Sequence, residues 1–251
     1  MGKSTQIVKR KFFLLPLSLL ILQACSVEDQ LIWQIGENDN SGAEFALAPQ
    51  EYSRYIEHDF GWEDKYFLIG KSDPERDWPY IIPGTSDTWG GTWGTSGWRS
   101  STLNILFGVE TLPRKGVWKL SLDLLECNSA DLPLFKVSVN GKAWKYRIPE
   151  ISTTGIDEQP DRGSEYLIEI PLDRDDLNEG GNLVSLTTLE GSWIKFDQIK
   201  LGGPGHTLLR NDELVHLRSV KTAAYEIEAD GEHFQPLLVD LEHLEGQPVL
   251  K

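Results

Sequence analysis

Apolar and polar residues alternate along much of the chain between residues 101 and 200. A period of two places successive side chains on opposite faces, as in a β-strand with one buried face. Residues 101–110 (STLNILFGVE) and 116–127 (GVWKLSLDLLEC) show the pattern most clearly. They predict two strands, whose apolar positions are Leu103, Ile105 and Phe107 in the first and Trp118, Leu120, Leu122 and Leu124 in the second.

Residues 134–149 (LFKVSVNGKAWKYRIP) predict a β-hairpin. The pair Asn140-Gly141 suits a two-residue type I′ turn, in which both central residues have a positive φ. Three more strands are expected, one in residues 164–172 and two in residues 180–201 around Gly191-Ser192. The alternating apolar positions are Phe135, Val137, Val139, Trp144, Tyr146 and Ile148 in the hairpin, and Tyr166, Ile168 and Ile170 after it.

About seven short strands joined by turns rich in Pro, Gly and Asp indicate an antiparallel β-sandwich. The Asn-Gly hairpin and the turn LNEGGNLV favour a jelly roll, so the predicted fold class is all-β. The best helical candidate is residues 49–61, where Tyr52, Tyr55 and Ile56 have helical spacing. That segment is either a short helix or an irregular aromatic stretch.

The C-terminal part of the chain predicts a second β unit. Residues 201–206 (LGGPGH) resemble a linker, and an Asp230-Gly231 turn follows between two short apolar segments. Two hairpins bury little core by themselves. We therefore expect a first domain over residues 25–201, and a linker with a partial second β domain or a packed tail over 202–251.

The N-terminus has the pattern of a secretory signal. A basic segment precedes an apolar run, Phe12–Leu22, that is too short to span a bilayer comfortably. The following Leu-Gln-Ala-Cys resembles the lipobox of bacterial lipoproteins, which implies cleavage after residue 24 and acylation of Cys25. Glu28 and Asp29 resemble the surface-export signal of Bacteroidetes lipoproteins. The expected location is the outer membrane, through a lipid anchor; the alternative is an ordinary signal peptide with a chance cysteine.

The charge of the chain excludes some partners. Residues 1–24 contain four basic and no acidic residues, so their removal leaves 20 Lys and Arg against 39 Asp and Glu, a net charge of −19. Such a protein repels phosphate backbones, so nucleic acid is not an expected partner. The two cysteines provide no disulfide framework, and Cys127 is expected in the core or at a strand end.

Residues 77–98 (DWPYIIPGTSDTWGGTWGTSGW) hold four of the nine tryptophans. Their spacings of 11, 4 and 5 mix odd and even steps, so the four cannot share one strand face. Indole rings stack on the apolar faces of sugars while polar neighbours bind the hydroxyl groups. The candidate ligand-binding residues are Trp78, Tyr80, Asp87, Trp89, Trp93, Trp98 and Arg99. The alternative is that the segment plugs one end of the sandwich; Trp33, Trp118, Trp144 and Trp193 are expected in the core.

Evidence for catalytic chemistry is sparse in the sequence. Asp73, Glu75, Asp77 and Asp87 flank the tryptophan segment and are numerous enough to supply a carboxylate pair of the glycosidase type, but a solvated loop edge explains them as well. The five histidines lack metal-ligand spacing, and no nucleophile elbow or phosphate loop is present. No metal site or cofactor is predicted, except that residues 37–44 (ENDNSGAE) have enough oxygen ligands for calcium.

Several segments together carry a family resemblance. They are residues 31–45 (LIWQIGENDNSGAEF), 66–84 (YFLIGKSDPERDWPYIIPG), 134–141 and 169–201. The chain resembles the third, carbohydrate-binding-like domain of polysaccharide lyase family 4, the rhamnogalacturonan lyases, over residues 31–201. The resemblance implies a galactose-binding-like β-sandwich associated with glycan breakdown. The catalytic residues of the lyases lie in another domain, and the tryptophan segment is richer in Trp than the family pattern.

The sequence therefore favours a non-catalytic module that binds a polysaccharide or oligosaccharide. It would be the N-terminal part of an exported lyase or glycoside hydrolase, whose catalytic domain follows. The alternatives are an enzyme in its own right, which uses carboxylates near the tryptophan segment, and a structural spacer that binds no sugar.

Overall fold

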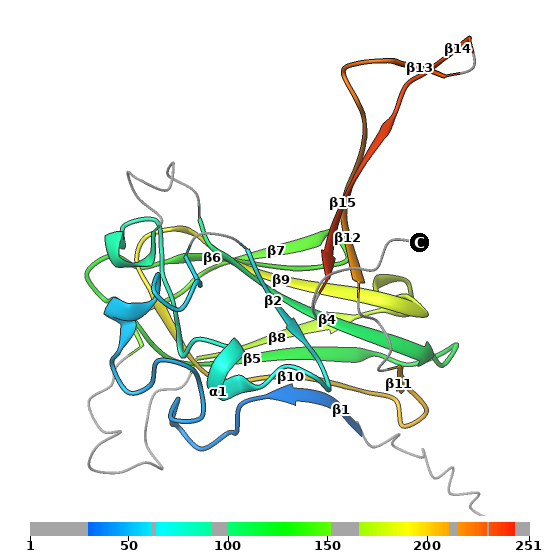
Figure 1. Ribbon diagram of the computed structural model, residues 1–251. Helices are drawn as coiled ribbons and strands as arrows, with labels where there is room; N and C mark the ends of the chain where they lie inside the picture. The colour runs from blue at the N-terminus through cyan, green and yellow to red at the C-terminus, as the bar shows by residue number, and fades with distance from the viewer. Residues whose placement is uncertain are drawn as a thin grey trace, which may run out of the picture.

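The computed structural model describes residues 30–61, 64–91, 100–151, 166–210, 215–229 and 231–243. Two largely antiparallel sheets pack face to face, and Figure 1 shows them as an upper and a lower layer. The predicted all-β jelly-roll sandwich is thus confirmed. Cys25, Trp93, Trp98 and Arg99 lie outside the described residues.

The first sheet has the order β1 (Gln30–Ile35), β10 (Ile194–Gly203), β5 (Trp118–Cys127) and β8 (Tyr166–Leu172), and β3 (Ile81–Ile82) also pairs with β10. The second has the order β11 (Leu208–Arg210), β4 (Thr102–Thr111), β9 (Gly180–Glu190), β6 (Leu134–Val139) and β7 (Lys142–Arg147), and β2 (Lys65–Leu68) runs parallel to β4. The helical elements are short: η1 (Tyr52–Arg54), α1 (Pro74–Asp77), η2 (Thr88–Gly90) and η5 (Arg174–Asp176). None of the helices among the described residues is long and apolar enough to cross a membrane.

Alternation in the sequence places the predicted residues in the core. All apolar positions predicted for β4 and β5 are buried, and so are Phe135, Val137 and Val139 of β6. The predicted hairpin turn is also present, since Asn140 has φ 49° and Gly141 has φ 90°. Cys127 ends β5 and is buried, as expected. Period-two patterning therefore identified the inner face of the sandwich correctly.

Aromatic rings fill the centre of the core. Phe196 of β10 lies with its ring centroid 5.9 Å from that of Trp78 and 6.3 Å from that of Phe135, which belongs to the opposite sheet. Tilted and edge-on pairs at such distances stabilise a core beyond the area that they bury. Trp33 and Trp118 are buried as predicted, whereas Trp144 and Trp193 are only half-buried.

The sandwich continues past the expected boundary at residue 201. Strand β10 runs to Gly203, and β11 pairs with β4, so the segment between them is a turn within the sandwich. The indole nitrogen of Trp118 donates to Thr207 Oγ1 at 2.9 Å and fixes this turn to the core.

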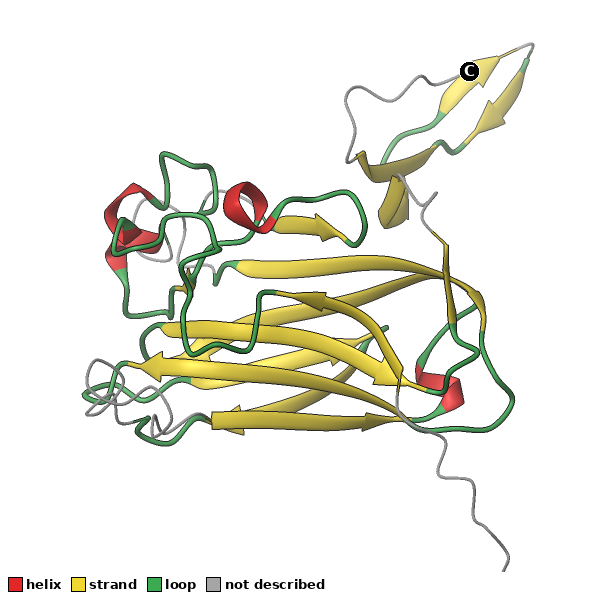
Figure 2. Ribbon diagram, turned by 90° about the horizontal axis from the view of Figure 1, so that it is seen from below, coloured by secondary structure: helices red, strands yellow, loops and turns green. Residues whose placement is uncertain are grey.

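The C-terminal strands form a ribbon that projects from the sandwich (Figures 1 and 2). It consists of two small antiparallel sheets, β12 (Val215–Thr222) with β15 (Leu237–His243) and β13 (Ile227–Ala229) with β14 (Glu232–Phe234). Apolar side chains on it are exposed, for example Leu237 at 63% and Val239 at 53%. These strands agree with the predicted start of a second β unit.

Replacement of Phe196 by alanine tests the aromatic core. Because the side chain is fully buried between two sheets, we expect Phe196→Ala to lower the free energy of unfolding by about 3–5 kcal/mol. Urea denaturation followed by tryptophan fluorescence measures the change. The control Val239→Ala, on the exposed ribbon, should stay within about 0.5 kcal/mol of wild type. A loss below about 1 kcal/mol for Phe196→Ala would contradict this description of the core.

Candidate functional site

Several loops gather at the end of the sandwich where β5 and β9 finish and β4, β6 and β10 begin. We call this end the loop rim; it comprises residues 36–61, 83–91, 128–133 and 191–193. Backbone hydrogen bonds connect its members, from Ser86 N to Gly191 O at 3.1 Å and from Ser192 N to Asp131 O at 3.0 Å. Gly84 approaches the same turn so closely that a Cβ atom there would lie 2.2 Å from Gly191 O. The loop rim is therefore a connected surface.

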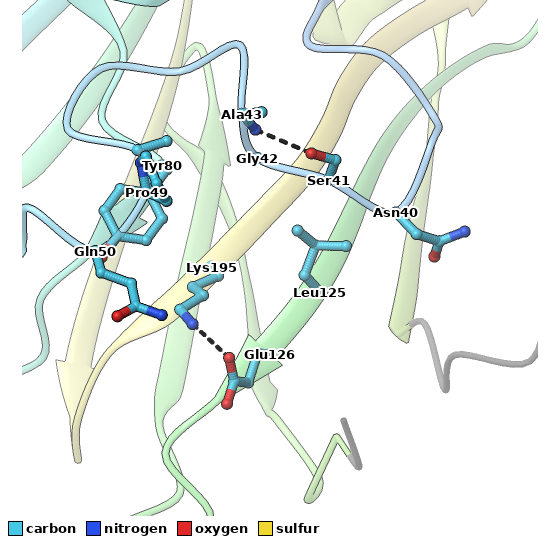
Figure 3. A pocket seen from close by; sticks show the side chains of 11 residues that line it. Asn40, Ser41, Gly42, Ala43, Pro49, Gln50, Tyr80, Leu125, Glu126 and Lys195 are labelled. Atoms are coloured by element: carbon cyan, nitrogen blue, oxygen red, sulfur yellow. Dashed lines mark hydrogen bonds and ion pairs between the residues drawn. The ribbon is translucent and has the colours of Figure 1, made fainter. Parts of the chain in front are cut away.

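A pocket of about 510 Å³ lies at this rim (Figure 3). We call it the rim pocket. Its floor comes from neighbouring strands, with Leu125 and Glu126 on β5 and Lys195 on β10. Tyr80, Pro49 and Gln50 lie on one side of it, and Ser41 and Asn40 lie on the other.

Two β-bulges shape the floor of the rim pocket. In the pairing of β10 with β5, Lys195 faces Glu126, Phe196 faces Leu124 and Gln198 faces Asp123. Leu125 and Asp197 are therefore the extra residues, one on each strand. A bulge re-aims the side chains around it, which explains why Leu125 and Glu126 line the pocket in succession.

Polar and aromatic groups meet in the pocket. Glu126 accepts from Lys195 Nζ, and both side chains remain partly exposed. Lys195 Nζ also lies 5.2 Å from the ring centroid of Trp193, in a cation–π contact. The pocket thus contains a charged pair, and the lysine of this pair also contacts a half-buried indole that is not among the lining residues.

Tyr80 is the predicted site residue that lines the pocket. Its side chain is 6% exposed. Burial raises the pKa of its hydroxyl, and the nearby Tyr52 and Glu126 side chains raise it further. The hydroxyl therefore stays protonated at neutral pH and can both donate and accept a hydrogen bond.

Trp89 lies on the loop rim beside the tyrosines of the 49–61 segment. Its ring centroid is 5.2 Å from that of Tyr52 and 5.5 Å from that of Tyr55, both edge-on. Tyr55 is buried, whereas Tyr52 is exposed and Trp89 is half-buried. The segment that predicted either a short helix or an irregular aromatic stretch contains η1 followed by turns, and it brings its tyrosines to the rim.

Trp78 and Asp87 have structural surroundings. Trp78 is 1% exposed and packs edge-on against Phe67 and Phe196, so it offers no face on which a sugar can stack. Asp87 is buried; its carboxylate accepts from Gly84 N at 2.8 Å and from Ser192 Oγ at 2.7 Å. Burial raises the pKa of Asp87 in spite of these hydrogen bonds. Both residues therefore support the rim from within, as the plug alternative expects.

The other candidate carboxylates also make local structural contacts. Asp73 caps α1 by accepting from Glu75 N at 3.1 Å. Asp77 accepts from Asp73 N at 2.8 Å and pairs with Arg76, and these contacts lower its pKa. An ionised, ion-paired carboxylate is a poor general acid. These contacts give no support to a glycosidase-type pair at α1.

Sequence reasoning missed Lys195 and Glu126 in the rim pocket, and Trp193 beside Lys195. The sequence does contain a signal. In a strand, Trp193 and Lys195 point to one face, and Ile194 and Phe196 point to the other. Because Ile194 and Phe196 are buried, the face that carries Trp193 and Lys195 points away from the core. Trp193 was instead expected in the core because it lies close to a strongly apolar strand.

Two buried carboxylates hold the loop that was considered for calcium, residues 37–44. Asp197 Oδ1 accepts from Ser41 N at 3.0 Å, and Asp123 Oδ2 accepts from Asn38 Nδ2 at 2.8 Å. Asp197 is 0% exposed, and its Oδ2 atom is buried without a hydrogen-bond partner among the described residues. Burial, together with the charges of Asp123 and Asp39, raises the pKa of Asp197 to about 7.

The side chains beneath loop 37–44 are oxygen donors, which calcium prefers as ligands. An ionised carboxylate with an unused buried oxygen is costly unless it is paired or binds a metal. Within the described part of the chain, no three His, Cys, Asp or Glu side chains gather into a metal cluster. A calcium ion here would therefore depend on Asp197 and Asp123 together with amide or carbonyl oxygens, which calcium accepts.

Comparisons with solved structures are distant. A family GH115 4-O-methyl-α-glucuronidase, BtGH115A, with specificity for decorated arabinogalactans, is 21% identical; the alignment covers 41% of this chain and 13% of that one, with a TM-score of 0.29. A family 35 carbohydrate-binding module from an environmental isolate is 10% identical, with 41% and 65% of the chains covered and a TM-score of 0.29. The family 35 module of Cellvibrio japonicus Abf62 is 15% identical, with 45% and 70% covered and a TM-score of 0.28. These TM-scores are too low to show that the whole folds correspond.

A comparison with curated proteins finds no match to the chain. The family model described as "CBM-like: Polysaccharide lyase family 4, domain III" matches residues 31–201. This range agrees with the resemblance that the sequence motifs indicated. It begins in β1 and ends in β10, two residues before that strand ends at Gly203. The match covers more than half of the chain, which therefore belongs to the carbohydrate-binding-like family of polysaccharide lyase family 4, domain III.

Proposed function

We propose that this carbohydrate-binding-like module holds a polysaccharide or oligosaccharide at the rim pocket. The observation that carries the proposal is the pocket itself, which Tyr80, Glu126 and Lys195 line, with the half-buried Trp193 in contact with Lys195. A sugar needs apolar surface for its ring face and polar groups for its hydroxyls, and this pocket offers both.

The binding follows from the chemistry of the pocket residues. The Glu126 carboxylate accepts from sugar hydroxyls, and the Lys195 ammonium group donates to them. The indole of Trp193 and the phenol of Tyr80 provide apolar contact. Because Glu126 and Lys195 already form a pair with each other, the two side chains lose little conformational freedom on binding. No bond in the sugar is broken in this proposal.

The wider role is proposed from the family and the N-terminal sequence. Domain III of a polysaccharide lyase is a part of a longer enzyme, and residues 1–25 have the pattern of a lipoprotein signal. We infer that the module belongs to an exported polysaccharide-degrading protein and holds it on its polymer. Its location would be the outer membrane, with Cys25 carrying the lipid.

A calcium ion beneath loop 37–44 would strengthen this site. The loop supplies Asn40 and Ser41 to the rim pocket, and Asp197 holds it through Ser41 N. A divalent cation beside Asp197 and Asp123 would favour the ionised form of Asp197, whose pKa burial raises to about 7. Its role in this proposal is to fix the loop in position before a sugar binds.

Alanine in place of Trp193 tests the rim pocket. Stacking that buries about 50 Å² of apolar surface contributes roughly 1.3 kcal/mol, so we expect Trp193→Ala to weaken glycan binding about tenfold. Affinity electrophoresis and titration calorimetry against pectin-type and mannan-type polysaccharides measure the effect.

The matched control for Trp193 is Trp144→Ala on β7. Trp144 is also half-buried, and Lys142 Nζ lies 5.2 Å from its ring centroid, the same arrangement as Lys195 with Trp193. Binding should survive this change. Equal losses for the two variants, or no glycan retained by the wild-type chain, would refute the rim pocket as the binding site.

Calcium addition tests the proposed cation site. At a concentration a hundred times its dissociation constant, calcium stabilises the fold by about 2.7 kcal/mol, so Tm should rise by about 5–10 °C over the EDTA-treated protein. Asp197→Asn should abolish the rise, because it removes one of the two carboxyl groups that would bind the ion. The exposed Asp175→Asn variant is the control and should keep the rise. If the wild-type Tm is the same in calcium and in EDTA, the proposed cation site is wrong.

A further inference from the structure

A second hollow lies on the outer face of the first sheet. Its volume is about 430 Å³, and it shares no lining residue with the rim pocket. Strands β1, β10 and β5 form its base, in the lower layer of Figure 1. We call it the sheet groove.

Strand register brings polar side chains together in the sheet groove. Lys200 lies in the middle of one row, with Gln34 of β1 on one side and Ser121 of β5 on the other. Gln198, two residues before Lys200 on β10, lines the groove as well, and so does Asn38 just after β1. Amide and hydroxyl groups both donate and accept hydrogen bonds, as an array that receives sugar hydroxyls must.

The charge of the sheet groove is opposite to that of the whole chain. The protein has 39 acidic and 24 basic residues, yet no Asp or Glu is among the described residues that line this hollow, whereas Lys119 and Lys200 both line it. Lys119 pairs with Glu169 of β8 at 2.8 Å. Lys200 forms no ion pair with any residue that the structure describes, so its charge is available to a ligand.

Exposed apolar surface lies beside these polar groups. Gly202 lines the groove, and a Cβ atom added there would meet a single atom, at 3.7 Å, so space is open above the backbone. Leu31, its partner across β1, is 50% exposed. An open glycine and an exposed leucine can accept the apolar face of a flat ring.

We infer that the sheet groove binds a carboxylate-bearing sugar residue of an acidic glycan, with Lys200 as the partner of the carboxylate. The inference takes the class of ligand from the proposed function and adds a second site on a different surface. An ammonium–carboxylate contact is stronger than a neutral hydrogen bond. At physiological ionic strength charges beyond about 8 Å are largely screened, so distant acidic residues have little effect here. Of the acidic residues near the groove, Glu169 is paired with Lys119 and Asp123 accepts from Asn38, which leaves Lys200 for the ligand.

Two variants of the sheet groove leave the core untouched. Lys200→Gln removes the cation and keeps a hydrogen-bonding side chain of similar length. Gly202→Leu fills the open space, because its side chain would extend on the face that Lys200 occupies. The control is Lys136→Gln, a half-buried lysine on β6 of the other sheet.

Titration calorimetry of the full chain with trigalacturonate tests the inference. We expect Lys200→Gln and Gly202→Leu each to weaken binding about tenfold or more, with Lys136→Gln unchanged. The same trisaccharide with its carboxyl groups reduced to alcohols should bind at least tenfold more weakly to wild type. Sodium sulfate at the same concentration should not compete, because it lacks the hydroxyl groups that the amide side chains bind.

The outcomes separate this inference from the proposed function. If trigalacturonate binds and Trp193→Ala abolishes the binding while Lys200→Gln does not, the sheet groove is refuted and the rim pocket stands. If reduction of the carboxyl groups has no effect, or the wild-type chain does not bind trigalacturonate, the inference is wrong. If sulfate competes fully, the groove is a general anion site and not a sugar site. If Trp193→Ala loses the binding of a neutral glycan while the groove variants keep it, the neutral glycan binds at the rim pocket and not in the sheet groove.

Discussion

Strand β10 is hydrogen-bonded to β5 on one side and to β1 and β3 on the other. Its inner side chains, Ile194, Phe196, Ile199 and Leu201, are buried in the core, and the aromatic contacts of Phe196 reach the opposite sheet. Its outer side chains line both hollows, with Lys195 in the rim pocket and Lys200 in the sheet groove. The pairing of this strand with β5 therefore positions the core and both surfaces.

The bulge at Asp197 lets one strand serve these purposes. An unbroken strand keeps a strict period of two, which would keep Asp197 on the same face as Lys195. The extra residue shifts the period, so that Phe196 and Ile199 both point inward although they are three positions apart. It also leaves Asp197 buried beneath loop 37–44, where it holds Ser41. Burial there raises the pKa of Asp197 to about 7.

Sequence reasoning succeeded where a single physical rule governs the outcome. Alternation identified the inner faces of β4, β5 and β6, and Asn140-Gly141 predicted its turn because positive φ suits these residues. The same reasoning did not identify the two bulges, since no local pattern separates Leu125 or Asp197 from an ordinary strand residue. It also favoured a ligand role for Trp78, which packs against Phe67 and Phe196 in the core. Residue type indicates that an indole needs a partner, but the partner can be the protein itself.

The rim pocket illustrates why the site was harder to predict than the fold. Its lining comes from loop 36–61, the segment before β3, and strands β5 and β10, which are far apart along the chain. Tyr80 lines the pocket, and its role in binding stays a prediction. The outward position of Trp193 follows only when its parity with Lys195 is considered. Long-range contacts bring these residues together, and no window of the sequence contains them.

A crystal structure of the full chain with an oligosaccharide that it retains would test the central claim most directly. The account predicts a sugar ring in the rim pocket, in contact with Trp193 or Tyr80 and hydrogen-bonded to Glu126 or Lys195. A bound sugar that touches none of these four residues, at a concentration that saturates binding in solution, would contradict it.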